Sequence, residues 1–237
     1  VTEFKVGDRV CGLFHQDWVD GEMRDECMST CLGASLHGVL TQYRTLDTKG
    51  VIKFPDHLSY EEAATLPCAA LTAWNCLSEN RSQTIGPNQS VLVLGTGGVS
   101  IFAIQFAVAA GARVIVASSS DEKLEKVKQM GVLDCINYKQ DPEWHVRVRE
   151  LTGGRGVDHV MEVGGAGTLE RSLKSVRRGG QVHMIGVLSG PQTTQPDVGL
   201  LVLFGGVTMR GLLVGSKGMF GNMNRALENN QQLKPVI

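Results

Sequence analysis

The most informative stretch of the sequence reads Leu94-Gly95-Thr96-Gly97-Gly98-Val99-Ser100. It follows the apolar run Ser90–Leu94, which predicts a strand buried on both faces, and it leads into an alanine-rich run, Val99–Ala110, which predicts a helix. A glycine-rich turn between a strand and a helix is typical of a βαβ unit that binds a dinucleotide. A glycine-rich turn that binds no ligand is the alternative.

Each position in this loop has a physical role in binding a diphosphate. Gly95 permits the sharp turn out of the strand, and Gly97 lets a pyrophosphate approach the bare backbone. The first amides of the following helix point at the phosphate, aided by the helix dipole. Ser100 stands where a third glycine is usual, and its small side chain still permits close packing of the helix on the strand. The predicted contacts are Gly95, Thr96, Gly97, Gly98 and Val99.

Strands and helices alternate regularly from about Thr84 onward. The predicted strands are Ser90–Leu94, Arg113–Ala117, Cys135–Asn137, Val157–Val163, Gln181–Val187 and Val207–Val214. The predicted helices are Val99–Ala110, Asp121–Met130, Pro142–Thr152 and Gly167–Val176. Strands that alternate with helices imply right-handed crossovers, and hence an α/β fold with a doubly wound parallel (Rossmann) sheet.

The residues before this region are less regular. Strand-like runs occur at Arg9–Phe14 and Val39–Arg44. Ser59 is a good N-cap for a helix that we expect to continue to Pro67. This part of the chain therefore predicts short elements joined by turns.

The end of the second predicted strand bears on the choice between NAD and NADP. An NAD site usually places an Asp or Glu there, which accepts hydrogen bonds from the ribose hydroxyls. Here the position falls on Ser118 or Ser119, so no carboxylate repels a 2′-phosphate, and Lys123 can reach that phosphate. We therefore predict NADP(H), with NAD(H) as the alternative, although Asp121 and Glu122 lie nearby and weaken the case. The serines could instead only cap the next helix, with the lysine solvated.

Three further glycine-containing segments follow later strands. Open parallel sheets bind ligands beyond the carboxyl ends of their strands, so we expect the nicotinamide half of the cofactor to pass these segments. Any one of them could be only a turn. The predicted contacts are Val163, Gly164 and Gly165, then Gly186, Val187 and Leu188, and finally Val214, which precedes Gly215.

Composition limits the classes of function. The 237 residues include 23 Lys and Arg and 24 Asp and Glu, and the net charge of −1 gives no electrostatic footprint for nucleic acid or an anionic membrane. The 42% hydrophobic and 20% charged residues are ordinary for a globular protein. The apolar runs Ile101–Ala110 and Val198–Val207 are shorter than the roughly 18 residues of a membrane span. Six cysteines without a C-x2-C pair, and no basic-then-apolar leader, predict reduced thiols and a cytoplasmic location.

Four more stretches carry a resemblance to a known family. They are Phe4–Val10, Glu61–Trp74, Thr152–Asp158 and Arg178–Gly180. With the glycine loop they resemble the medium-chain dehydrogenase/reductase superfamily, and in particular its zinc-type alcohol dehydrogenase-like and quinone oxidoreductase-like branch. The resemblance implies a GroES-like, β-rich catalytic domain on both sides of the Rossmann domain. We therefore expect a partial GroES-like substrate domain at 1–80, the dinucleotide-binding domain at 81–215, and a helix that returns to the substrate domain at 216–237, with the chain truncated at both ends.

The resemblance implies two further contacts. Thr72 resembles a threonine near the nicotinamide, and it is the one catalytic residue that we predict, as a hydrogen-bond donor to negative charge developing on an oxygen. Tyr138 resembles a tyrosine that packs by the adenosine phosphate in NADPH-using quinone reductases. Asn137-Tyr138 could equally be the end of a strand.

The resemblance also raises the question of a catalytic zinc. In zinc alcohol dehydrogenases a cysteine at the place of Cys68 is a metal ligand. A catalytic zinc needs three protein ligands, and the others would lie before Val1. We predict no metal, with Cys68 as a small buried residue near the nicotinamide.

A structural zinc is not expected either. The closely spaced four-cysteine pattern of that site is absent, and Cys11, Cys27 and Cys31 do not reproduce it. The histidines of this region, which have no ligand-like spacing with the cysteines and suit surface or loop positions, are His15, His37 and His57.

These observations predict an NADP(H)-dependent oxidoreductase that transfers hydride to or from a small carbonyl, enone or quinone substrate without zinc. A zinc- and NAD-dependent alcohol dehydrogenase and a non-catalytic nucleotide-binding relative are the alternatives. The small-molecule substrate itself cannot be chosen from the sequence. Family members often pair their last Rossmann strands edge to edge, and Val207–Val214 is apolar, so we predict a homodimer through that edge. We predict neither a nucleic acid nor a membrane as a partner.

Overall fold

The computed structural model describes residues 3–79, 83–190 and 197–236. It divides into two compact units, one formed by Val1–Asn75 with Val214–Ile237 and the other by Cys76–Leu213. The chain passes from the first unit to the second inside helix α2 (Leu71–Leu77). The sequence predicted domain boundaries at residues 80 and 215. Among the described residues, no helix combines the length and the apolar character that crossing a membrane requires.

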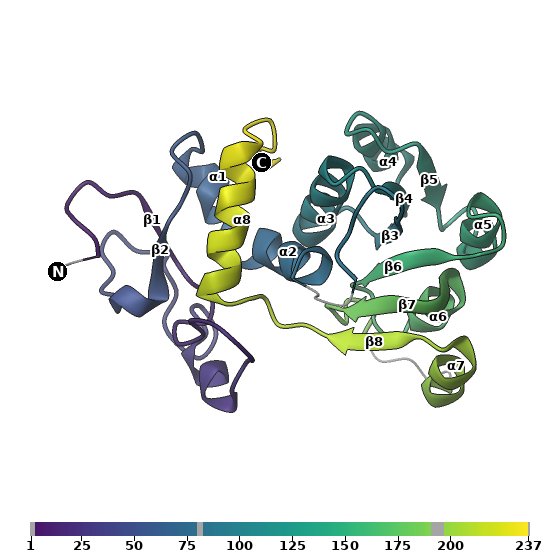
Figure 1. Cartoon of the computed structure of the whole chain (residues 1–237), viewed down its shortest axis with the longest axis horizontal. Helices are drawn as coiled ribbons and strands as arrows, with labels where there is room; N and C mark the ends of the chain where they lie inside the picture. Colours follow the sequence, from purple (N-terminus) through teal and green to yellow (C-terminus); the bar gives the residue numbers. More distant parts are fainter. Residues whose placement is uncertain (1–2, 80–82, 191–196, 237) are drawn as a thin grey trace. The chain divides into compact units, whose positions relative to one another are not determined.

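The second unit is a parallel sheet flanked by helices (Figure 1). Its strands are β3 (Ser90–Leu94), β4 (Arg113–Ser118), β5 (Asp134–Asn137), β6 (Val157–Glu162), β7 (Val176–Met184) and β8 (Thr208–Gly211). Its other helices are α3 (Gly98–Ala109), α4 (Asp121–Lys128), α5 (Trp144–Leu151), α6 (Leu169–Ser175) and α7 (Val198–Gly205). The strands lie in the order β5-β4-β3-β6-β7-β8, so the order reverses between β3 and β6. The predicted α/β, doubly wound fold is confirmed, and such sheets bind ligands beyond the carboxyl ends of the strands at the reversal.

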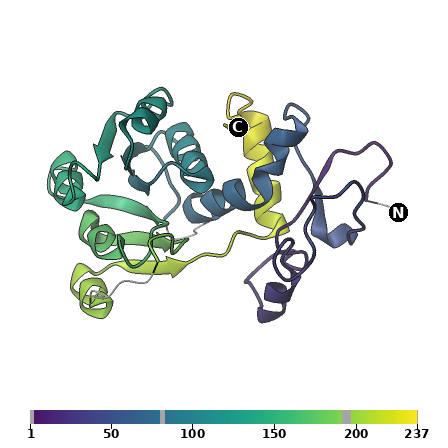
Figure 2. The same cartoon turned by 180° about the vertical axis from the view of Figure 1, so that it is seen from behind.

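The central strand β3 shows why the sheet needs helices on both faces. All five of its residues are buried, and successive side chains point to opposite faces. Leu92 and Leu94 belong to a core cluster that includes Trp144 of α5. Val91 and Val93 point to the other face, where α3 contacts β3 and β4. In both views α5, α6 and α7 follow one another along the sheet (Figures 1 and 2).

Strand β7 differs from its prediction at both ends. It begins at Val176 rather than Gln181, and it ends at Met184 rather than Val187. The glycines near its start are explained by the neighbouring strand. A Cβ on Gly180 would lie only 3.0 Å from the Asp158 carbonyl oxygen of β6. The close approach of the two backbones therefore requires glycine at this point of the strand.

The last part of the second unit also differs from its prediction. β8 spans only Thr208–Gly211 of the predicted Val207–Val214. The helix α7 was not predicted, because Val198–Gly205 has apolar side chains and glycines all round and so lacks the 3.6-residue period that marks an amphipathic helix.

The first unit is built from short elements. They are β1 (Val10–Gly12), two 3₁₀ turns (Asp25–Thr30 and Thr48–Gly50), β2 (Val51–Lys53), α1 (Tyr60–Ala64), a π-helical turn (Leu66–Ala70), the start of α2, and α8 (Lys217–Asn229). β1 and β2 pair antiparallel. α1 begins with a capping box, in which the Glu62 amide donates to the Ser59 hydroxyl at 3.1 Å and the Ser59 amide donates to the Glu62 carboxylate at 2.7 Å. α8 packs against β2, where Asn224 donates to the Lys53 carbonyl at 2.7 Å.

One prediction for the first unit is wrong. Val39–Arg44 is not a strand, because these residues are exposed and pair with no strand in the described part of the chain. An isolated extended segment leaves its backbone groups to water and gains nothing from a ladder.

His15, expected at a surface or loop position, lies in the loop after β1. Its side chain is nevertheless buried and packs edge-on against Phe14 and Trp18. Its Nδ1 atom lies 3.2 Å from the Cys31 sulfur.

The amino-terminal ends of the central strands are joined by a buried carboxylate. Asp158 of β6 accepts hydrogen bonds from the Ser90 amide at 2.8 Å, from Arg155 at 2.8 Å and from Arg177 at 2.6 Å. Burial alone would raise the pKa of Asp158, but the arginine and serine donors hold it well below its usual value. This ion pair network links β3, β6 and β7 at one end of the sheet.

Two buried histidines lie side by side on the sheet. His159 of β6 and His183 of β7 are stacked, with ring centroids 5.4 Å apart and the Nδ1 of His159 3.1 Å from the Nε2 of His183. Burial lowers the pKa of His159 to about 4, where Asp158 opposes and Arg177 adds to the effect. Burial, His159 and Arg210 lower the pKa of His183 to about 3. Both imidazoles are therefore neutral at pH 7, and one can donate to the other.

These histidines predict an acid-sensitive fold. In the unfolded chain they bind protons below their ordinary pKa of 6.5, whereas in the folded chain His159 does so only below about 4, so protons favour unfolding between these values. We expect the free energy of unfolding to be unaffected by them above pH 7 and to fall by about 2 kcal/mol per histidine at pH 5. Urea unfolding at pH 7.5 and pH 5 measures this. His183→Gln should make the loss smaller, and an unchanged loss would contradict the assignment.

Candidate functional site

The glycine loop leaves β3 at the point where the strand order reverses. Gly95 adopts a φ of 74°, which favours glycine, and its amide donates to the Ala117 carbonyl of β4 at 2.7 Å. The Ser100 hydroxyl donates to the Leu94 carbonyl at 2.8 Å. Ser100 therefore closes the turn from inside, which accounts for a serine in place of the third glycine.

The outer part of the loop is open. Gly97 has an ordinary φ of −80°, and a Cβ built on it would meet nothing within 4 Å. The fold itself therefore does not require a glycine here, whereas a ligand that rests on the backbone does. Among the described residues no acceptor is found for the amides of Gly97, Gly98 and Val99. These amides begin a helix of 12 residues, so they and the helix dipole favour an anion at this place.

The serines after β4 have different surroundings. Ser118 is buried at the strand end, and Ser119 is half-buried beside it. The Ser120 hydroxyl accepts from the Lys123 amide at 3.4 Å and caps α4. The alternative of helix capping thus applies to Ser120, and it leaves Ser118 and Ser119 as candidates for a ligand.

The charges near these serines are mixed, because Lys123 favours an anion whereas Asp121 keeps its negative charge beside neutral amide donors. Asp121 accepts from Asn137 at 2.7 Å and from Gln140 at 2.8 Å, so both of its carboxylate oxygens are engaged. Glu122 forms an ion pair with Lys126 at 3.0 Å. Lys123 is exposed, and within the described ranges it forms no ion pair. The two acids that weakened the sequence argument are therefore bound to other groups.

Tyr138 lies beside Ser118. It follows β5, and its amide donates to the Ser118 carbonyl at 3.1 Å. Its side chain is half-exposed. The structure thus brings together Ser118 and Tyr138, which are far apart in sequence, at the carboxyl ends of β4 and β5.

The loops after β6 and β7 are interleaved. The Leu188 amide donates to the Val163 carbonyl at 3.2 Å. A Cβ on Gly165 would lie 2.8 Å from the Val187 Cα, and one on Gly186 would lie 2.7 Å from the Val163 carbonyl oxygen. These glycines are therefore required by the packing of the two loops, with or without a ligand. The loops present the side chains of Val187 and Leu188, which are 76% and 84% exposed.

A carboxylate that the sequence analysis missed supports these loops. Glu162 ends β6 and is fully buried, yet only the three residues after it were predicted as contacts. The strand run itself gave no clear signal, because Asp158 and His159 also interrupt its apolar residues. A buried charge needs several donors, and the residues that supply them come later in the chain.

Two predicted site residues belong to the first unit. Thr72 is almost fully buried, and its hydroxyl donates to the Cys68 carbonyl at 2.7 Å. Val214 adopts a φ of 60°, which is unusual for a β-branched residue, and its carbonyl accepts from Asn75 at 2.7 Å. Their predicted contacts with a nicotinamide remain predictions.

The donors of this chain do not by themselves fit a zinc site. Cys68 is exposed rather than buried as predicted, because it lies on the outer side of the π-helical turn. Desolvation raises the pKa of its thiol. Within residues 3–79, 83–190 and 197–236, no group of three His, Cys, Asp or Glu side chains is arranged to hold a metal ion.

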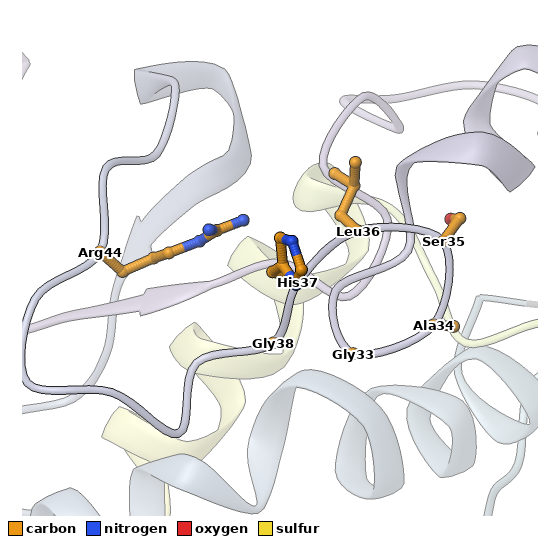
Figure 3. Close-up of a pocket in the computed structure, with 7 residues that line it drawn as sticks. All are labelled: Gly33, Ala34, Ser35, Leu36, His37, Gly38 and Arg44. Atoms are coloured by element: carbon orange, nitrogen blue, oxygen red, sulfur yellow. The ribbon is translucent and has the colours of Figure 1, made fainter.

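A separate hollow lies on the first unit. It has a volume of about 420 Å³ and is lined by residues 33–38 and Arg44 (Figure 3). The Arg44 side chain extends toward His37 in this view. None of the predicted site residues lines it, so it is not part of the candidate site.

Comparison with known proteins gives a consistent family. The family model described as zinc-binding dehydrogenase matches residues 98–229. A zinc-type alcohol dehydrogenase-like protein of Schizosaccharomyces pombe is 41% identical over 239 residues, which cover 100% of this chain and 69% of that protein. The structure of a putative alcohol dehydrogenase from Sinorhizobium meliloti 1021 superimposes with a TM-score of 0.89 at 38% identity, covering 100% of this chain and 68% of that one.

Other similar proteins carry different names. The structure of an NAD-dependent alcohol dehydrogenase has a TM-score of 0.84 at 32% identity and covers 99% of this chain and 69% of its own. A crotonyl-CoA reductase of Streptomyces collinus is 34% identical over 170 residues, covering 65% of this chain and 38% of that protein. The names therefore agree on dehydrogenases and reductases and differ in substrate.

Gly97→Ala tests the open loop. We expect a change in the free energy of unfolding of about 1 kcal/mol or less, because an N-cap residue tolerates this φ and the Cβ meets no atom. We expect NADPH binding to weaken by about tenfold or more, because the Cβ occupies the space of the diphosphate. Thermal unfolding and nicotinamide fluorescence measure the two effects.

Gly86→Ala is the matched control, since a Cβ at this position also meets nothing within 4 Å. It should leave binding unchanged. Equal NADPH affinity for Gly97→Ala and the native chain would contradict a diphosphate at the loop.

Proposed function

The chain belongs to the zinc-binding dehydrogenase family and is an oxidoreductase of the medium-chain dehydrogenase/reductase type, and from this premise we propose that it transfers hydride between NADP(H) and a small carbonyl, enone or quinone substrate. The observation that carries the proposal is the open backbone at Gly97, with amides that have no acceptor among the described residues at the start of α3. This surface suits a diphosphate, which a dinucleotide supplies.

Three groups of residues in the second unit would each contact a different part of the cofactor. The loop Gly95–Val99 would bind the diphosphate through its amides. Ser118, Ser119 and Tyr138 would surround the adenosine side, and the loops after β6 and β7 would border the nicotinamide side. The bound cofactor would supply or accept the hydride, and the chain would orient it.

The preference for NADP(H) rests on charge. No acidic side chain ends β4, and the nearest acids, Asp121 and Glu122, are engaged by other side chains. Lys123 is exposed at the start of α4 and is available to a 2′-phosphate. One similar structure is named NAD-dependent, so NAD(H) is the competing cofactor in the test below.

Thr72 is the proposed catalytic contact. Its hydroxyl proton is engaged by the Cys68 carbonyl, so donation to a substrate oxygen would require the hydroxyl to rotate away from that carbonyl. Thr72→Val should then lower kcat more than it weakens cofactor binding, since the cofactor contact is apolar in part. The proposed substrate class comes from the family resemblance, and one similar protein is named crotonyl-CoA reductase.

A zinc- and NAD-dependent alcohol dehydrogenase is the second candidate, and the description of the matching family favours it. Hydride transfer without zinc is the first candidate because the chain lacks the closely spaced four-cysteine pattern of the structural zinc site. Metal analysis of the purified protein separates the two, because stoichiometric zinc would support the second candidate. Cofactor binding without turnover of carbonyls, enones or quinones would instead favour a non-catalytic relative.

We also propose a homodimer through the edge of the sheet. β8 is the edge strand, and the neighbouring α7 exposes Leu200, Leu203 and Phe204. An uncovered edge strand beside apolar side chains favours pairing with a second copy. Light scattering should give twice the 25.6 kDa of one chain, and Phe204→Asp should shift the population toward the monomer. A native chain that is monomeric at micromolar concentration would refute the proposal.

Lys123→Glu tests the phosphate assignment. We expect NADPH binding to weaken by about tenfold or more while NADH binding changes little, because the reversal replaces attraction by repulsion only where a 2′-phosphate is present. Fluorescence titration with both cofactors gives the ratio of the two affinities.

Lys128→Glu makes the same charge change at the far end of α4 and is the matched control. It should leave the ratio unaltered. If Lys123→Glu also leaves the ratio unaltered, this lysine does not contact the phosphate.

A further inference from the structure

Glu162 has the most complete set of hydrogen bonds at the carboxyl edge of the sheet. Its Oε1 accepts from the Gly164 amide at 2.7 Å, from the Gly165 amide at 2.9 Å and from the Thr168 hydroxyl at 2.6 Å. Its Oε2 accepts from the Ser172 hydroxyl of α6. The side chain is fully buried. Four neutral donors thus satisfy one carboxylate.

The same residue joins the neighbouring loop through its backbone. The Glu162 carbonyl accepts from the Ile185 amide at 2.8 Å and from the Gly186 amide at 3.3 Å. Its side chain therefore fixes the loop after β6, and its main chain fixes the start of the loop after β7. Ser189 of the loop after β7 also joins the two loops, since its hydroxyl donates to the Gly164 carbonyl at 2.6 Å and its amide donates to the same carbonyl at 2.8 Å.

The geometry of the loop after β6 depends on this carboxylate. Gly165 has a φ of 81°, and the Thr168 hydroxyl passes so close to Gly164 that a Cβ there would lie 2.3 Å from it. Removing an acceptor from such an arrangement leaves buried donors without a partner, which costs more than the bond itself contributes. In the described part of the chain no ion pair of Glu162 is found, so the donors and the carboxylate depend on each other.

We propose that Glu162 is a positioning residue for the nicotinamide half of the cofactor. It holds the loops after β6 and β7 together from beneath, so that Val187 and Leu188 form a fixed apolar surface on the outside. The inference rests on the proposed cofactor binding. It assigns to the adenosine half no dependence on Glu162, because all the donors found for this carboxylate in the described residues come from the loop after β6 and from α6.

The test compares two ligands on the full chain. NADPH carries the nicotinamide, whereas 2′-phospho-ADP-ribose keeps the adenosine side and the diphosphate but lacks the ring. For Glu162→Gln we expect NADPH to bind about tenfold more weakly, because the amide cannot accept at both ends of the carboxylate. Binding of 2′-phospho-ADP-ribose should change by less than about twofold. Calorimetric titration gives both affinities.

Ser175→Ala is the matched control. Ser175 is a buried serine of the same helix, and its hydroxyl donates only to the Arg171 carbonyl at 2.8 Å. The Ser175→Ala variant loses a hydroxyl that does not bond to Glu162, so its affinities for NADPH and for 2′-phospho-ADP-ribose should stay unchanged. If Glu162 had only a structural role, Glu162→Gln would weaken the binding of both ligands equally. That result would overturn the proposal.

A milder pair of variants keeps the test decisive if Glu162→Gln does not fold. Thr168→Val removes one donor from the carboxylate and should weaken NADPH selectively, and Thr168→Ser restores the hydroxyl and should restore binding. Failure of the serine to rescue overturns the proposal. If the native chain binds neither ligand, the proposed function fails and this inference with it, whereas native binding that Glu162→Gln leaves intact refutes the inference alone.

Discussion

The amides at the start of α3 are the constraint around which the second unit is organised. A helix always begins with amides that have no partner inside it, and most helices cap them with a side chain. Here the N-cap is Gly97, which has no side chain to offer, and no acceptor is found for the amides in the described residues. A parallel sheet places the carboxyl ends of all its strands at this edge, so every later loop returns to the same place. Such amides favour an anion at this point.

The glycines of the site fall into two kinds. Gly97 is unconstrained by its neighbours, so packing does not account for a glycine there. Gly165 and Gly186 are required by contact with backbone atoms of the adjoining loop. The sequence presents both kinds alike, since a glycine after a strand is compatible with a turn, a close packing contact or a binding surface. The distinction matters because only the first kind leaves the backbone open to a bound molecule.

The sequence predicted the second unit well because its strands are buried on both faces. β3 is a continuous apolar run between polar residues, and its bounds follow from that pattern alone. α7 lacks a polar face, so no period marked it, and the Val39–Arg44 run has the apolar alternation of a strand but no partner in the described chain. Glu162 was missed for a related reason, because its importance lies in four donors that come from later residues and cannot be read from spacing.

Strand β6 has a buried acidic residue near each end, and the two residues are stabilised in different ways. At its amino end, Asp158 is neutralised by Arg155 and Arg177, and burial of that network favours a single fixed arrangement of three strands. At its carboxyl end, the Glu162 carboxylate is held by neutral donors from the loop after β6 and from α6, with no ion pair found for it in the described chain. Neutral donors stabilise a carboxylate without pairing it with a cation. The two ends of β6 therefore fix their surroundings differently, since the amino end depends on an ion pair network and the carboxyl end on hydrogen bonds from the backbone and hydroxyls that follow it.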